Sequence, residues 1–387
     1  MEKIRVVVVG AGAFGGWTAL ELVRRGALVE LIDAWGPGTA RASSGGETRV
    51  IRATYGSHAI YTRMAIRALE RWRDHDRRFQ WSALHVTGSL WMSSQDDGFA
   101  EASRRSLADA GLAFERLTPR DAAARYPQID FSGITEVFRE PEAGYLFASR
   151  ACAQVTQQVV AEGGTYRVAA VRSPAAFEDD GRALAIADGT RIEADAFVFA
   201  CGPWLPSLFP DVLGRLITPT RQDVYYFGVP PGETRLSDPH LPVWLELGGR
   251  FFYGIPGAPE RGFKIADDTP GPPVDPSVQE RVPDPDGVSR ARQYLARRFP
   301  VLANAPLIRA EVCQYESTPD ANFIIDRHPA SSNVWIVGGG SGHGFKMGPA
   351  VGEIVADAVL GKSSPDPLFG VARFGSPPAG GWKKKWS

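Results

Sequence analysis

Three glycines near the N-terminus, Gly10, Gly12 and Gly15, constrain the fold more than any other feature of the sequence. They follow a β-branched run at residues 6–9 and precede a helical stretch that stops at Gly26. In this spacing the first glycine permits a tight turn, the second lets a pyrophosphate approach the backbone, and the third allows the helix to pack closely on the strand. The pattern predicts a strand–turn–helix unit whose helix N-terminus binds the phosphates of a dinucleotide.

A second strand, predicted at residues 28–32, completes a βαβ unit of the usual size. Asp33 ends this strand, about twenty residues after the glycines, where an acid can accept hydrogen bonds from a ribose. We expect Ala13 and Phe14, inside the glycine turn, to contact the same cofactor. The motif alone does not distinguish FAD from NAD, and a glycine turn without a ligand is the alternative.

Hydrophobic periodicity and turn residues predict the later elements. We expect helices at residues 61–77, 149–162 and 349–360, strand-like runs between 84 and 92, a hairpin over 184–192 with its turn at Asp188-Gly189, and buried strands at 196–200 and 334–337. Residues 216–315 differ, since alternating aromatic segments, interrupted by a Pro- and Asp-rich stretch at 267–286, are typical of an antiparallel sheet with loops.

A chain that leaves a nucleotide-binding fold, builds an antiparallel sheet and returns predicts two interleaved domains in an α/β (α+β) architecture. We assign residues 1–83, 145–215 and 320–387 to a discontinuous, Rossmann-like dinucleotide domain. Residues 84–144 and 216–319 are assigned to a mainly antiparallel substrate domain. Ligands in such architectures bind between the domains.

Composition narrows the partners. The chain is 44% hydrophobic and 22% charged, which is typical of a soluble globular protein, and its net charge of −1 gives no general attraction to nucleic acid or anionic membrane. Cys152, Cys201 and Cys313 are too few and too scattered for a disulfide scaffold or a closed zinc site. We therefore expect a cytoplasmic protein without a metal site, and we interpret Cys152 and Cys201 as structural.

A loop of small residues at 43–48 leads to two arginines, Arg49 and Arg52, three positions apart. On a helical turn these two would project to one side and suit an anion. Taken alone, such a pair is more often a solvated basic face.

At this point the chain resembles a known family, that of monomeric sarcosine oxidase, which includes N-methyltryptophan oxidase and belongs to the D-amino-acid-oxidase superfamily of flavoproteins. The similarity extends over nearly the whole length. Besides the glycine motif and Asp33, it rests on ETRVIR at 47–52, EAGYLF at 142–147, YGIP at 253–256, GFK at 262–264, CQY at 313–315, NFIIDRHP at 322–329 and SGHGFK at 341–346. The resemblance implies FAD as the cofactor and a monomeric protein.

The same resemblance implies cofactor contacts. Cys313 matches the cysteine whose sulfur is bonded to the 8α carbon of the flavin, for which a thiolate is the required nucleophile. On sequence alone a buried, inert cysteine would be the commoner reading, and the flanking match reverses that preference. Arg49 matches an arginine beside the flavin ring. The other expected cofactor-binding residues are Ser44, Thr48, Gly340, Gly342, His343, Gly344 and Lys346.

Substrate contacts are implied in the same way. Arg52 and Lys346 match the cations that hold the substrate carboxylate and so orient the substrate. Lys264 matches a lysine that promotes reaction with dioxygen through its positive charge. Tyr253 and Tyr315 match pocket tyrosines, although either is also compatible with an ordinary core position.

Three residues depart from the pattern of the family's sarcosine oxidases. Gly45 and Asp268 stand where those enzymes have histidines, and Trp244 stands where they have a methionine. We expect all three in the substrate pocket, where they would open space, add a negative charge and add a flat aromatic wall, respectively. These changes predict an amine bulkier than sarcosine or partly cationic.

The predicted function is FAD-dependent oxidation of the C–N bond of a small carboxylate-bearing amine, such as an N-methyl amino acid. The imine would hydrolyse in water, and dioxygen would be reduced to hydrogen peroxide. One alternative is a dehydrogenase that passes electrons to a quinone or a carrier protein, and another is a flavin-binding protein without amine turnover. A nicotinamide-dependent dehydrogenase is the third.

Overall fold

The predicted βαβ unit forms the N-terminus of the computed structural model, which describes residues 3–95, 98–172, 183–258 and 260–375. β1 (Arg5–Val9), α1 (Ala13–Arg24) and β2 (Leu28–Asp33) follow one another. The two strands pair in parallel, with Val6 opposite Val29. The valines of β1 are buried, as expected for a strand covered on both faces.

Around this unit lies a six-stranded sheet in the order β18-β19-β12-β1-β2-β9. The strands predicted at 196–200 and 334–337 are β12 and β19, and both run parallel to their neighbours toward β1. The added strands are β9 (Thr165–Val168), β12 (Ala196–Phe199), β18 (Ile324–Arg327) and β19 (Val334–Gly338). The predicted hairpin is also present, as β10 (Ala183–Ala185) and β11 (Arg191–Glu193). The mixed α/β fold class is thereby confirmed.

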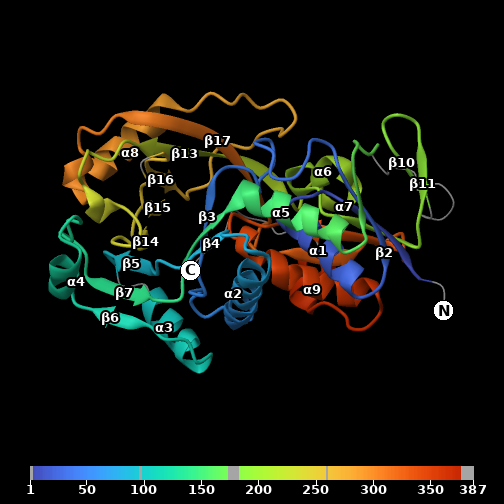
Figure 1. Cartoon of the computed structure of the whole chain (residues 1–387), viewed down its shortest axis with the longest axis horizontal. Coiled ribbons are helices and arrows are strands. Elements are labelled where there is room, and N and C mark those ends of the chain that lie inside the picture. Colours follow the sequence, from blue (N-terminus) through green and yellow to red (C-terminus); the bar gives the residue numbers. More distant parts are fainter. Residues whose placement is uncertain (1–2, 96–97, 173–182, 259, 376–387) are drawn as a thin grey trace.

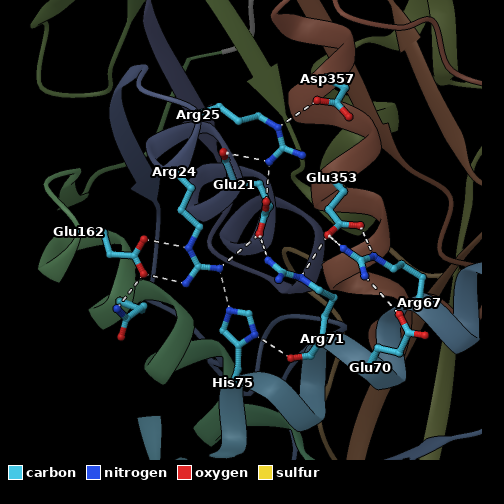
Figure 2. Close-up of polar contacts among 11 residues, drawn as sticks. Glu21, Arg24, Arg25, Arg67, Glu70, Arg71, His75, Glu162, Glu353 and Asp357 are labelled. Atoms are coloured by element: carbon cyan, nitrogen blue, oxygen red, sulfur yellow. Dashed lines mark hydrogen bonds and ion pairs between the residues drawn. The ribbon is translucent and has the colours of Figure 1, made fainter. Parts of the chain in front are cut away.

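The predicted long helices are α2 (Ala59–Phe79), α5 (Ala148–Ala161) and α9 (Gly348–Val359). Figure 2 shows that a network of ion pairs joins them to α1. Glu21 of α1 contacts Arg25 at 2.5 Å and Arg71 of α2 at 2.7 Å, and Arg71 also contacts Glu353 of α9. Burial acts to raise the pKa of Glu21, but the hydrogen bonds and charges of Arg25 and Arg71 outweigh it and lower that pKa.

A second, eight-stranded sheet has the order β17-β13-β16-β15-β14-β5-β7-β6. Figure 1 places β13–β17 on the opposite side of the molecule from α1 and α9. The sheet is mainly antiparallel, as predicted, and the one parallel pair within its described residues joins β14 to β5, which lies outside residues 216–315. The strands are β5 (Ser89–Ser93), β6 (Glu115–Leu117), β7 (Glu136–Glu140), β13 (Thr218–Phe227), β14 (Val243–Leu247), β15 (Phe252–Ile255), β16 (Phe263–Asp267) and β17 (Leu307–Ser317).

A helix that the sequence analysis missed, α8 (Pro285–Arg298), covers one face of this sheet. Asp284 caps its N-terminus by accepting hydrogen bonds from the N–H groups of Asp286 and Gly287. An Asp cap followed by proline at the first helical position is a strong start signal. We overlooked it because the surrounding residues are polar and rich in proline. The remaining helices are α3 (Phe99–Asp109), α4 (Pro119–Arg125), α6 (Leu205–Leu208) and α7 (Pro210–Leu213).

Between the two large sheets lies a three-stranded sheet of β3 (Thr48–Ile51), β8 (Gly144–Phe147) and β4 (Leu84–His85). Arg49 lies in β3 and Arg52 follows this strand directly, so the two arginines lie on extended chain rather than on a helical turn. The strands of the six-stranded sheet lie within the ranges assigned to the dinucleotide domain. Those of the eight-stranded sheet lie within the ranges assigned to the substrate domain, and the division itself stays a prediction.

Candidate active site

The first cavity, of about 240 Å³, lies at the carboxyl ends of β1, β2, β12 and β19, and we call it the dinucleotide cavity. Ligands of open α/β sheets bind at this edge. Most of the predicted cofactor-binding residues line it. They are Gly10, Gly12, Ala13, Phe14, Asp33, Ser44, Arg49, Gly340, Gly342 and Gly344.

The glycines of the motif have the expected physical roles. Gly10 has φ +105°, which favours glycine, and a Cβ there would lie 2.3 Å from the carbonyl oxygen of Ala200. A Cβ on Gly15 would lie 1.8 Å from the carbonyl oxygen of Gly10, so Gly15 allows α1 to pack on the strand without itself lining the cavity. Gly12 is the N-cap residue of α1 and has no side chain that could accept a capping hydrogen bond. The N-terminus of the helix therefore faces the cavity, which Gly12 lines.

Several polar side chains line this cavity. Asp33 accepts a hydrogen bond from the N–H of Ala11 at 2.8 Å, which holds the carboxylate at the end of β2. The Ser43 hydroxyl and one oxygen of Glu316 are buried without a hydrogen-bond partner in the described part of the chain. Cys201, interpreted from sequence as structural, also lines the cavity, and burial raises the pKa of its thiol. A polar ligand would complete the unfilled contacts.

A second, smaller cavity, of about 60 Å³, adjoins the first, and we call it the substrate cavity. The two share the lining residues Arg49, Tyr315, Gly342 and Phe345. Of the predicted pocket residues, the substrate cavity is lined by Arg52, Tyr253, Asp268, Tyr315 and Lys346, together with His343. His343 was predicted to bind the cofactor, and Lys346 to bind both the cofactor and the substrate. Both residues line this cavity, and neither lines the larger one.

Two cations of the substrate cavity are buried around one aromatic ring. The Arg52 guanidinium lies 4.6 Å and the Lys346 ammonium 5.2 Å from the centroid of Tyr55. Arg52 donates to the carbonyl oxygen of Thr54, and Lys346 donates to that of His343 at 2.9 Å. Burial lowers the pKa of Arg52, because the charge is costly away from water. An anion that entered the cavity would offset that cost.

Glu140 of β7, which sequence analysis missed, holds the segment beside Arg52. Its carboxylate accepts hydrogen bonds from the N–H groups of Ala53 and Thr54, at 2.6 and 3.2 Å, and from the Thr54 hydroxyl at 2.7 Å. Glu140 thereby fixes the carbonyl of Thr54 that Arg52 contacts. It lies 88 residues from Arg52, so no local pattern connects the two.

The opposite charge in the substrate cavity comes from Asp268. Its carboxylate accepts a hydrogen bond of 2.7 Å from the Tyr315 hydroxyl. Burial and the charge of Asp268 raise the pKa of Tyr253 to about 12 and that of Tyr315 well above its usual range. Both tyrosines therefore keep their protons at neutral pH, and Tyr315 donates its proton to Asp268.

Lys264, Thr48 and Cys313 lie close behind these cavities, outside the residues that line them. The Lys264 ammonium donates to the carbonyl oxygen of Thr48 at 2.7 Å. Arg49, the neighbour of Thr48, donates to the sulfur of Cys313 at 3.3 Å. The structure thus brings Lys264, Arg49 and Cys313 together where the two cavities meet.

Two predicted pocket residues are placed elsewhere. Trp244 belongs to β14, and its side chain lies on the sheet face covered by α8, stacked on Tyr294 at 5.5 Å, while Leu245 faces the substrate cavity. Gly45 does not open space, because a Cβ there would lie 2.1 Å from the carbonyl oxygen of Thr39. Both predictions are wrong, because alternation along a strand and loop packing decided the two positions.

Among the residues that the structure describes, no cluster of three or more His, Cys, Asp or Glu side chains could hold a metal ion. Within the same residues, no helix combines the length and the apolar character that crossing a bilayer requires.

Comparison with known proteins gives one consistent result. The family model described as FAD dependent oxidoreductase (DAO) matches residues 5–358. Monomeric sarcosine oxidase from Streptomyces avermitilis is 30% identical over 383 residues, which covers 97% of this chain and 98% of that protein. N-methyl-L-tryptophan oxidase from Escherichia coli O157:H7 is 28% identical over 386 residues, which covers 96% of this chain and 100% of that protein. The structure of L-proline dehydrogenase from P. horikoshii has the same fold, with a TM-score of 0.80, 22% identity and coverage of 96% and 98%.

Proposed function

This chain belongs to the FAD-dependent oxidoreductase (DAO) family and acts on C–N bonds, and we propose that its substrate is a small amine that carries a carboxylate. One observation carries the proposal. Two buried cations, Arg52 and Lys346, face a cavity that adjoins the dinucleotide cavity and also contains a carboxylate, Asp268. An amino acid presents the complementary pair of charges.

The residues of the dinucleotide cavity suit FAD in their chemistry. Glycines leave the approach to α1 open, and Asp33, Ser43 and Glu316 offer polar atoms to a ligand rich in hydroxyls. When bound, the flavin supplies the acceptor for the two electrons of C–N oxidation. We propose that Cys313 would hold it through a thioether to the 8α carbon, with the thiol and that carbon each giving up a hydrogen and dioxygen taking up the two hydrogens and two electrons as hydrogen peroxide. The position of Cys313 beside Arg49, where the cavities meet, supports this proposal.

The chain's own residues then have distinct roles. Arg52 and Lys346 bind the carboxylate and orient the carbon to be oxidised. Asp268 attracts the amine end, and the hydroxyls of Tyr253 and Tyr315 donate hydrogen bonds near it. Phe251 and Phe345 line the substrate cavity and exclude water from it. The imine product hydrolyses in water, and dioxygen takes up two electrons and two protons near Lys264 to leave as hydrogen peroxide.

The substrate class is narrower than the sequence suggested. Gly45 and Trp244 do not line the substrate cavity, so the argument for a bulkier amine falls, and the cavity is small. Asp268 remains, and it favours an amine that enters as an ammonium ion or carries a second cationic group. We therefore propose a small N-methyl or cyclic amino acid, oxidised by a monomer.

The deciding test is anaerobic mixing of the purified protein with N-methyl, cyclic and primary amino acids, followed by admission of air. Bleaching of the yellow colour by one class, with recovery and stoichiometric peroxide in air, is expected. Bleaching that recovers only with a quinone or dye would favour the dehydrogenase alternative, which Lys264 argues against. No bleaching by any member would favour a flavin-binding protein without amine turnover.

The covalent bond has its own test. Acid precipitation of the wild-type protein should leave yellow colour in the pellet, whereas Cys313→Ala should release all of it to the supernatant. Cys152→Ala is the matched control, because Cys152 is buried in α5 and lines neither cavity. Complete release from the wild type would rule out the bond.

A further inference from the structure

Glu316, the second-last residue of β17, is a buried carboxyl group with one unfilled contact. Its side chain is 8% exposed, and its Oε1 accepts a hydrogen bond of 3.2 Å from the N–H of Gly340. Its Oε2 is buried and has no hydrogen-bond partner among residues 3–375 as far as these are described. Burial raises the pKa of Glu316 to about 7. A buried polar atom without a partner is costly, so such an atom in a cavity wall points to a ligand.

Glu316 belongs to the wall of the dinucleotide cavity, and its Oε2 lies beside Gly202, which is part of the same wall. Glu316 lines that cavity together with Gly202, Gly340 and Tyr315. A Cβ on Gly202 would lie 2.8 Å from Oε2, and one on Gly340 would lie 3.1 Å from Oε1. Because both flanking residues are glycines, an occupant of the cavity can reach the carboxylate directly.

In its ionised form Glu316 takes a hydrogen-bond donor as its partner, since a carboxylate repels phosphates. FAD carries hydroxyls on two segments, the ribose and the ribityl chain. Within the described residues, the two carboxylates that line the cavity are Asp33 and Glu316. Asp33 ends β2, and Glu316 lies next to the end of β19, where it contacts the N–H of Gly340. Those strands are three strand spacings apart, roughly 14 Å, so one hydroxyl cannot satisfy both.

We propose that Glu316 accepts a hydrogen bond from a hydroxyl of the ribityl chain of FAD, while Asp33 serves the ribose. The adjacent Tyr315 lines both cavities, so Glu316 lies where the cofactor approaches the substrate. Glu316 thereby positions the flavin end of the cofactor against the substrate cavity. The inference rests on the binding of FAD that the proposed function requires.

The test measures cofactor affinity rather than turnover. All proteins in this test carry Cys313→Ser, which makes the cofactor exchangeable. Each is titrated with FAD and with three FAD analogues that each lack one ribityl hydroxyl. Flavin fluorescence reports the Kd. With Glu316 intact, one analogue should bind about 10- to 100-fold more weakly than FAD, the value of a hydrogen bond to a charged group. Glu316→Leu should bind FAD more weakly by the same factor. Its affinity for that analogue should equal that of the protein with Glu316 intact. Glu316→Gln, which keeps an acceptor oxygen, should recover part of the affinity.

Asp33→Asn is the matched control, because it should bind FAD and FAD made from 2′-deoxyadenosine with similar affinity, while its discrimination against the ribityl analogue stays that of the protein with Asp33 intact. Equal affinity of the Glu316 protein for FAD and all three analogues would overturn the inference, and this comparison needs no variant at position 316. If the loss of affinity caused by Glu316→Leu and the loss caused by the missing hydroxyl simply added, the inference would be overturned as well. Failure of the wild-type protein itself to bind FAD would overturn the proposed function, and this inference with it.

Discussion

The ammonium nitrogen of Lys264 lies 2.7 Å from the carbonyl oxygen of Thr48, so that β16 and β3 are joined by a buried cation next to Arg49. Burial, followed by the charge of Arg49, lowers the pKa of Lys264 to about 7. Lys264 therefore changes its charge within the physiological range, whereas an exposed lysine would not.

We predict that reaction with dioxygen depends on the protonated form of Lys264. The lysine is charged below its pKa and neutral above it, so the rate constant for reoxidation of reduced protein should fall about tenfold per pH unit above pH 7. Lys264→Met should be slower by roughly 10²- to 10³-fold at low pH and independent of pH. Stopped-flow mixing of photoreduced protein with dioxygen measures both. The same pH profile in the variant would contradict the assignment.

Arg52 and Lys346 should set the affinity for carboxylates. Arg52→Met and Lys346→Met should each weaken binding of a simple carboxylate inhibitor about 10- to 100-fold, since each removes a charged hydrogen-bond donor. The same two substitutions should weaken binding of the methyl ester of a substrate amino acid much less, because the ester carries no carboxylate charge. Perturbation of the visible flavin spectrum gives the Kd values. Arg77→Met, at an exposed position of α2, is the control and should change neither.

Trp244 and Leu245 are neighbours on β14 that face opposite sides of the sheet. Trp244→Ala should lower the free energy of unfolding by about 3–5 kcal/mol, as expected for a large buried side chain, and leave KM unchanged in the folded fraction. Leu245→Ala should change KM, because Leu245 lines the substrate cavity. Urea unfolding and steady-state kinetics separate the two effects. A shift in substrate preference with Trp244→Phe would restore Trp244 to the pocket.

Glu21 should stabilise the fold in a pH-dependent way. Its pKa is lowered in the folded state, so its contribution is present above the unfolded value near 4.5 and is lost as the pH falls through the folded pKa. Glu21→Gln should cost about 3 kcal/mol at pH 7, because it leaves Arg25 and Arg71 short of a partner, and progressively less in acid. Thermal unfolding across pH 3–8 measures this. Glu70→Gln, at an exposed ion pair, is the control and should change little.

Much of the fold could be read from local patterns. The glycine motif, the valines of β1 and the apolar stripe of α2 are short-range features, and each predicted its element because backbone geometry and burial periodicity depend on near neighbours. The helix α8 was missed although Asp284-Pro285 carries a start signal. The parallel pairing of β14 with β5 has no local signal at all, because it joins segments about 150 residues apart.

The candidate site divides in the same way. The sequence by itself determined the dinucleotide fold and the residue types of the site, because glycine turns, an acid at a strand end and the SGHGFK segment are written in consecutive positions. Only the tertiary structure decided which side chains meet. It placed Trp244 on the far face of its strand, packed Gly45 against Thr39, set Glu140 behind Arg52 and put Glu316 in the wall of the dinucleotide cavity. These outcomes depend on the direction in which a side chain leaves its strand and on what packs against it, and both are set by contacts between segments distant in sequence.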